Sequence, residues 1–133
     1  MIMSVADNLE LVRRAYAAFS AGDIDTLSGL LAPDVVHSVP GSSALSGDHK
    51  GLPNVLTLYG QLAERSAGTV RVDLEDVLSD GGDRVIAIHV ATAERDGKRL
   101  SAREALLFTI AGEHVAEIQD FSSDIESNDL FWS

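Results

Sequence analysis

The spacing of the apolar residues changes from a helical to a strand period about halfway along the chain. Before Gly68, large apolar residues recur every three or four positions, as one face of an α-helix requires. After Gly68, apolar and polar residues alternate, as in a strand with one buried face. Helices that precede a run of strands are typical of an α+β domain, because a doubly wound parallel sheet needs strands and helices to alternate.

The first half of the chain predicts three helices. The first covers residues 4–21, where either Ser4 with Asp7 or Asp7 with Glu10 can cap its start and Gly22 can close its end. The second starts after Asp23 and ends before Pro33, and the third begins with a proline in its first turn and ends before Gly68. The inward faces are expected to be Val5, Leu9, Val12, Tyr16 and Phe19 on the first helix, Leu27, Leu30 and Leu31 on the second, and Val55, Leu58, Tyr59 and Leu62 on the third.

Strands are expected from the remaining segments. Residues 35–39 predict one strand between the second and third helices, followed by a long loop over residues 40–51 that is rich in turn-forming residues. Residues 70–122 predict four antiparallel strands with a β-bulge at residues 76–77, and turns at residues 81–82, 96–97 and 112. The strand over residues 84–94 is apolar on both faces, so it should lie inside the sheet. The tail, residues 124–133, is expected to be short helix or irregular.

Composition limits the class of protein. A chain of 133 residues predicts one domain, residues 1–133. Ten Lys plus Arg against 21 Asp plus Glu give a net charge of −11, which excludes nucleic acid as a partner. There is no cysteine, so disulfides and thiolate chemistry are absent. No apolar run approaches the ~20 residues of a membrane span, and the start of the chain lacks a signal-peptide pattern. We therefore expect a soluble cytoplasmic protein.

Three motifs resemble the SnoaL-like branch of the nuclear-transport-factor-like superfamily, which also holds the ketosteroid isomerases. They are Gly22-Asp23 between the first two helices, residues 39–47 after the first strand, and residues 94–97 at the hairpin, and the likeness spans residues 8–132. The resemblance implies a cone-shaped α+β barrel: a curved, mostly antiparallel sheet wrapped by three N-terminal helices around a ligand pocket. It implies a polyketide cyclase-like or isomerase-like protein, although the superfamily also contains dehydratases, epoxide hydrolases and binding modules.

The catalytic residues of the superfamily carry over only in part. The isomerases use an Asp as base where this chain has Val39, so the steroid isomerase mechanism is disfavoured. A dehydratase of the superfamily uses paired histidines with tyrosines, and His89 and Tyr59 match part of that set. The polyketide cyclases use an Asp in the pocket as acid/base, and Asp120 on the last strand matches it.

The alternation of side chains along the strands predicts which residues face the pocket. We expect Asp120, His89 and His37 to be catalytic, because a carboxylate in an apolar cavity must be paired or become a competent acid/base, and histidine transfers protons near neutral pH. Alternatively, each histidine is a hydrogen-bonded core residue, and Asp120 is exposed at a strand end or caps a helix. Glu104 is expected either to pair with Asp120 or to form a salt bridge in the neighbourhood of Arg103. The expected substrate-binding residues are Tyr16, Phe19, Val39, Tyr59, Glu104, Leu106, Phe108 and Ile118.

No metal and no cofactor are expected. His37 and His89 lack the close spacing of a metal-binding pair, none of the glycine-rich loops has a phosphate-binding pattern, and no serine stands in a nucleophile elbow. His49 and His114 fall in a polar loop and a turn, where we expect them to be solvated.

Partners are expected to be a small apolar molecule and a second copy of the chain. Ile86, Ile88 and Val90 form the outer face of one strand, and burial of this stripe predicts a homodimer through the outer face of the sheet. The alternative is that loops or the C-terminal segment with Phe131 and Trp132 cover the stripe. The sequence favours cofactor-free acid/base catalysis, namely isomerisation, cyclisation or dehydration, on an apolar molecule such as a polycyclic compound. Two alternatives remain: a non-catalytic ligand-binding module, and a dimerisation or scaffold module whose cone is filled by side chains.

Overall fold

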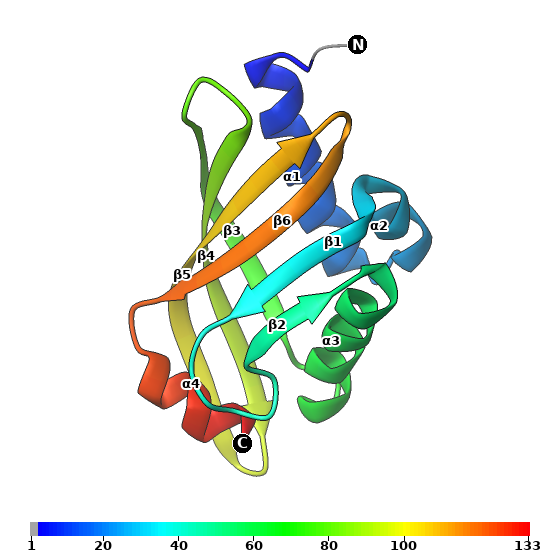
Figure 1. Cartoon of the computed structure of the whole chain (residues 1–133). Helices are drawn as coiled ribbons and strands as arrows, with labels where there is room; N and C mark the ends of the chain where they lie inside the picture. The colour runs from blue at the N-terminus through cyan, green and yellow to red at the C-terminus, as the bar shows by residue number, and fades with distance from the viewer. Residues whose placement is uncertain (1–2) are drawn as a thin grey trace.

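The computed structural model describes residues 3–133, and within them a curved sheet carries helices on one side (Figure 1). Helices form where the helical period and the capping signals coincide, and strands form in the alternating segments. The elements in chain order are α1 (Val5–Ala21), α2 (Ile24–Leu30), β1 (Leu31–Val39), β2 (Gly47–Lys50), α3 (Leu52–Arg65), β3 (Arg71–Ser79), β4 (Arg84–Arg95), β5 (Lys98–Ala111), β6 (His114–Ser122) and α4 (Ile125–Trp132).

The predicted caps of α1 are confirmed. Ser4 and Asp7 form a reciprocal capping box, and Gly22 closes the helix with a φ of 66°, a conformation that glycine adopts without strain. Val5 was expected to face inward, but this is wrong, since 41% of its surface is exposed. The helix presents Ala15 and Ala18 to the core instead, and these small side chains let it approach the sheet closely.

The predicted end of α2 is also wrong. The helix stops at Leu30, so Leu31, expected on its apolar face, begins strand β1. Pro33 lies inside this strand, between its paired residues Leu31 and Val36, where the register with β6 shifts. A proline is tolerated there because the irregular stretch does not need its missing N–H donor.

The sheet has six strands in the order β2-β1-β6-β5-β4-β3. The antiparallel run β3 to β6 was predicted, and β4 lies inside the sheet as expected. The β-bulge, expected at residues 76–77, lies slightly earlier, between Leu74 and Asp76. Two features correct the sequence prediction. β1 joins the run by parallel pairing with β6, and part of the expected loop, residues 47–50, forms edge strand β2. This short segment is polar and largely exposed, so it carries no apolar alternation.

The helices cover the concave face of the sheet (Figure 1). α1 packs against β3 and β4, α3 packs against β1 and β2, and α2 contacts both of these helices. The result is the predicted cone-shaped α+β fold, although the sheet is open, because β2 and β3 are not paired to each other. The C-terminal segment forms a fourth helix, α4, against β5. None of the helices within residues 3–133 has the length and apolar character of a membrane span.

Candidate functional site

The sheet and the helices surround a cavity of about 150 Å³. Its wall is mainly apolar. Its histidines and carboxylates come from β1, β4, β5, β6 and α4, and its two tyrosines come from α1 and α3. All eleven site residues predicted from the sequence line this one cavity, although their roles stay predictions. They are Tyr16, Phe19, His37, Val39, Tyr59, His89, Glu104, Leu106, Phe108, Ile118 and Asp120.

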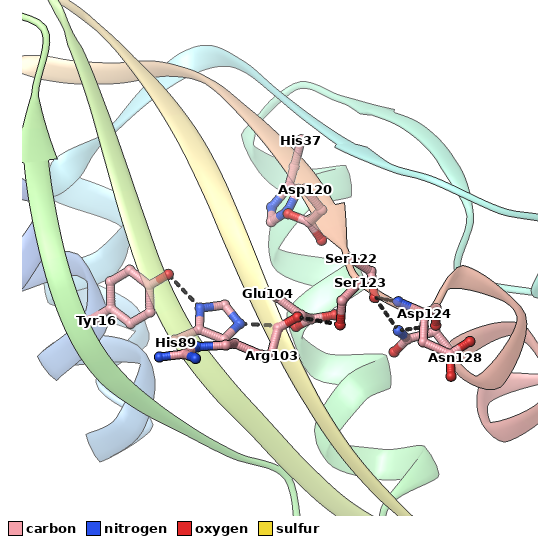
Figure 2. Close-up of polar contacts among 10 residues, drawn as sticks. All are labelled: Tyr16, His37, His89, Arg103, Glu104, Asp120, Ser122, Ser123, Asp124 and Asn128. Atoms are coloured by element: carbon pink, nitrogen blue, oxygen red, sulfur yellow. Dashed lines mark hydrogen bonds and ion pairs between the residues drawn. The ribbon is translucent and has the colours of Figure 1, made fainter.

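Tyr16, His89 and Glu104 form a continuous hydrogen-bonded chain, which we call relay A (Figure 2). The hydroxyl of Tyr16 lies 2.6 Å from His89 Nδ1, and His89 Nε2 lies 2.9 Å from Glu104 Oε1. Helix α1 supplies the tyrosine, while neighbouring strands β4 and β5 place His89 directly opposite Glu104 in their antiparallel register. Relay A therefore connects the helix layer to the sheet across the cavity.

Tyr59, His37 and Asp120 repeat this arrangement on other elements, and we call them relay B. The hydroxyl of Tyr59 lies 2.8 Å from His37 Nδ1, and His37 Nε2 lies 2.7 Å from Asp120 Oδ1. Here α3 supplies the tyrosine, and the parallel strands β1 and β6 supply the other two residues. In both relays, tyrosine binds Nδ1 and a carboxylate binds Nε2 of the histidine.

The register of β5 and β6 brings the two relays together. Leu106 lies opposite Asp120 and Glu104 lies opposite Ser122, so Glu104 and Asp120 are diagonal neighbours on the same face. Diagonal pairs on an antiparallel sheet have backbones roughly 7–8 Å apart, which long side chains can bridge. Figure 2 shows Asp120 and His37 beside the line of relay A. One ligand in the cavity can therefore reach both carboxylates.

The hydrogen bonds determine which ring nitrogen carries the proton. A neutral tyrosine has one O–H hydrogen, and Nδ1 of the histidine is the only acceptor within reach of each hydroxyl among residues 3–133. A histidine that accepts at Nδ1 carries its hydrogen on Nε2, which donates to the carboxylate. Every hydrogen in the two relays then has an acceptor. For a neutral ring, this pattern corresponds to the Nε2–H tautomer of both His37 and His89.

One oxygen of each relay carboxylate is not used by its histidine and remains available to a ligand. Glu104 Oε1 and Asp120 Oδ1 accept from histidine, while Glu104 Oε2 and Asp120 Oδ2 have no protein partner within residues 3–133. The carboxylate side chains are 17% and 19% exposed, against 4% and 7% for His89 and His37. The histidines are buried behind the carboxylates, with both ring nitrogens occupied. The acceptors that a ligand meets first are therefore the two free carboxylate oxygens.

Burial raises the pKa of both tyrosines well above the usual range, and the negative charge of Asp120 adds to the effect. Because Tyr16 and Tyr59 are the only two tyrosines of the chain, an alkaline titration reports on the site alone. We expect no tyrosinate absorbance from the folded protein as the pH passes about 10, the value of a free tyrosine. The folded state holds these protons more tightly than the unfolded state, so their stabilising contribution is complete below that pH and is lost above it.

The absorbance of tyrosinate and the circular dichroism should therefore change together. A tyrosinate signal that rises near pH 10 with the fold intact would contradict the burial of these hydroxyls.

The mouth of the cavity is formed by α4 and the loop after β1. Both carboxylate oxygens of Asp129 accept hydrogen bonds from Ser42, and one also accepts from the backbone of Ser43. A side chain at Gly41, whose φ is 95°, would collide with this carboxylate. Arg95 and Lys98 donate to backbone carbonyls at the end of α4, where a helix favours positive charge. The C-terminal helix is therefore held across one end of the cavity.

Sequence reasoning missed several features of this site. Glu104 pairs with His89, which was neither of its two expected partners, whereas Arg103 points outward and pairs with Glu75. Asp129 and Trp132 also line the cavity, and the late aromatic pair Phe131-Trp132 was the signal that could have found them. His49 is half-buried and bonded to the Leu45 carbonyl, so the expectation of a solvated side chain is wrong for it. His114 is exposed, as expected.

No three His, Cys, Asp or Glu side chains within residues 3–133 converge as metal ligands would. The two histidines of the cavity each use both ring nitrogens in the relays. A metal ion would have to displace those hydrogen bonds before it could bind.

Known proteins resemble this chain over most of its length, both in sequence and in structure. The family model of the SnoaL-like domain matches residues 12–118. An uncharacterised protein of Mycobacterium tuberculosis is 43% identical, over 95% of this chain and 96% of its own length. The structure of Bal32a, from a soil-derived mobile gene cassette, is 39% identical with a TM-score of 0.93, and the match covers 96% of this chain and 98% of Bal32a.

A more distant structure shares the fold alone. A protein of Jannaschia sp. CCS1 described as a putative SnoaL-like polyketide cyclase is 20% identical, with a TM-score of 0.75 over 89% of this chain and 86% of its own.

Proposed function

The chain belongs to the SnoaL-like domain family, with the nuclear-transport-factor-like fold, and from this premise we propose that it is a cofactor-independent acid/base enzyme. Its substrate is a small apolar molecule, and its reaction is an isomerisation, cyclisation or dehydration. The observation that carries this proposal is the pair of Tyr–His–carboxylate relays that meet in one apolar cavity. A chain without cysteine gains nothing from an oxidising compartment, so we place the enzyme in the cytoplasm.

Asp120 is the principal acid/base in this proposal, and Glu104 is the second. Asp120 Oδ2 takes a proton from the substrate, while Oδ1 keeps its hydrogen bond from His37 Nε2–H. The resulting neutral carboxylic acid returns the proton to another atom of the same substrate, which restores the Asp120 carboxylate for the next turnover. His37 and Tyr59 hold the carboxylate in place, and His89 and Tyr16 do the same for Glu104. The histidines are thus positioning residues, because no ring nitrogen is free to contact substrate.

The test is a proton-exchange assay in D2O. The wild-type protein is mixed with a panel of one-ring and two-ring ketones and alcohols, and NMR follows loss of carbon-bound protons and elimination of water. We expect faster exchange or product formation than in buffer for at least one compound, and loss of the effect in the double variant Asp120→Asn/Glu104→Gln. Compounds that bind without any accelerated exchange or conversion would instead identify a ligand-binding module and overturn the catalytic proposal.

We also propose that the protein is a homodimer through the outer face of the sheet. Leu78, Ile86 and Leu107 lie opposite one another across β3, β4 and β5. In the neighbouring row, Phe121 lies opposite Ala105. Phe121 is 50% exposed and Ile86 is 42% exposed, so this face presents a contiguous apolar surface. Burial against a second copy removes that surface from water.

A charge in this surface should separate the dimer. We expect light scattering to give the mass of a dimer for the wild type and of a monomer for Ile86→Glu. The matched control is Ile24→Glu on α2, since Ile24 is 47% exposed and lies away from the outer face. A monomeric wild type, or a control that dissociates as Ile86→Glu does, would contradict the proposed interface.

A further inference from the structure

The charges around the cavity are unbalanced. Three carboxylates line it, from Glu104, Asp120 and Asp129, while no lysine or arginine of residues 3–133 does so. Asp129 uses both oxygens on the loop after β1. Its charge is therefore matched by hydrogen-bond donors, whereas Glu104 and Asp120 each present a free oxygen to the interior.

These two free oxygens can only accept hydrogen bonds, because an ionised carboxylate has no hydrogen to donate. The tyrosine hydroxyls add no free donor, since each gives its single hydrogen to a histidine. The histidines likewise give their Nε2 hydrogens to the carboxylates. The two relays therefore offer a ligand acceptors and negative charge and no free donor. The other donors of the lining are uncharged, from Ser43, Thr92, Ser122, Asn128 and Trp132, so none of them offsets this charge.

We propose that the cavity selects a ligand with an apolar ring and a polar group that donates hydrogen bonds and bears no negative charge, and that a protonated amine fits it best. This inference rests on the proposed function, because it names the substrate class of the same site. A charge-assisted hydrogen bond to Glu104 Oε2 would hold the ammonium group and leave Asp120 Oδ2 to exchange a proton with the substrate. Carboxylate or phosphate ligands are excluded, because they would meet two like charges with no cation to offset them.

The rest of the wall suits the ring of such a ligand. Phe19 and Tyr59 pack edge to face, as do Tyr16 and His89, and Trp132 lies at the α4 end. A cation close to the face of an aromatic ring gains further stabilisation. An apolar cavity of about 150 Å³ in another protein holds benzene. The cavity here has the same volume, so a body of about one ring fits it without rearrangement.

The test compares three probes that share a benzyl or phenyl ring and differ in the polar group: benzylamine, benzyl alcohol and benzoate. Binding to the wild-type protein is measured by calorimetry at neutral pH and at about 0.15 M salt, which screens attraction to the acidic surface. Trp132, the single tryptophan, reports by fluorescence whether the probe has entered the cavity. We expect the affinity to fall in the order amine, alcohol, carboxylate, with at least about a tenfold difference between benzylamine and benzoate.

Two sets of variants show where the selectivity originates. In Asp120→Asn/Glu104→Gln, the preference for benzylamine over benzoate should shrink to within about threefold. Glu117→Gln is the matched control, because it removes an exposed carboxylate of β6 that lies outside the cavity lining, and it should keep the full preference. Circular dichroism of each variant establishes that it is folded.

Three results would overturn the inference: benzoate that binds as tightly as benzylamine, a control that loses the preference as the double variant does, or no binding by any of the three probes. Failure of the proposed function gives a different result, namely the expected affinity order without any accelerated proton exchange.

Discussion

Replacement of Asp120 by asparagine is expected to lower kcat by about 10²- to 10⁴-fold on any substrate that the enzyme turns over, the range typical of losing one general acid/base. The amide keeps the size of the side chain and can still accept from His37 Nε2–H through its oxygen. It cannot take a proton from the substrate. The loss should therefore fall mainly on kcat, while ligand affinity changes much less.

Two variants separate the chemistry of Asp120 from general effects. Tyr59→Phe keeps the carboxylate and its histidine but removes the hydrogen bond at His37 Nδ1, so a loss of about tenfold or less is expected. Asp73→Asn removes an exposed carboxylate of β3 and should keep full activity. An Asp120→Asn variant with wild-type kcat, or a loss in Tyr59→Phe as large as in Asp120→Asn, would contradict the role given to Asp120.

Replacement of His89 by leucine is expected to destabilise the protein by about 3 kcal/mol, because it leaves a buried donor and a charged acceptor without their hydrogen-bond partner. The substitution leaves the Tyr16 hydroxyl without an acceptor and Glu104 without its donor, although Glu104 is only 17% exposed. Urea denaturation of the variant measures the free energy of unfolding, provided that the slope with denaturant stays unchanged.

Two further variants test whether the loss of stability comes from relay A. His114→Leu replaces an exposed histidine and should change the free energy of unfolding by about 0.5 kcal/mol or less. The triple variant Tyr16→Phe/His89→Leu/Glu104→Leu removes every polar group of the relay, and we expect it to regain most of the lost stability. A His89→Leu protein as stable as the wild type would mean that the hydrogen bonds of relay A are not formed in solution.

Much of the site was predictable because successive side chains of a strand point to opposite faces of the sheet. His37 and His89 lie among apolar residues with a two-residue period, so their facing followed from the pattern, as did that of Asp120 and Glu104. The hairpin turns fixed the register of the antiparallel run from β3 to β6. For this reason the sequence predicted which site residues of β4, β5 and β6 share the inner face of the sheet.

The partners within each relay were not predictable in the same way. His37 meets Asp120 only because β1 pairs with β6, a parallel contact between strands roughly eighty residues apart, about which neither strand carries a local signal. Tyr16 meets His89 through the rotation of α1 on the sheet, which depends on packing. The same limit explains β2, a polar edge strand that is held only by its pairing with β1.

The ring nitrogens of the two buried histidines test the central claim, that two closed Tyr–His–carboxylate relays line the cavity. The chain has four histidines, so nitrogen NMR of the ¹⁵N-labelled protein at neutral pH can resolve each ring, with single substitutions for assignment. For the neutral ring of both His37 and His89, the relays predict the hydrogen on Nε2 and an acceptor at Nδ1. A hydrogen on Nδ1 of the neutral ring, or tautomers in rapid exchange as for a solvated histidine, would contradict the relays and the function proposed from them.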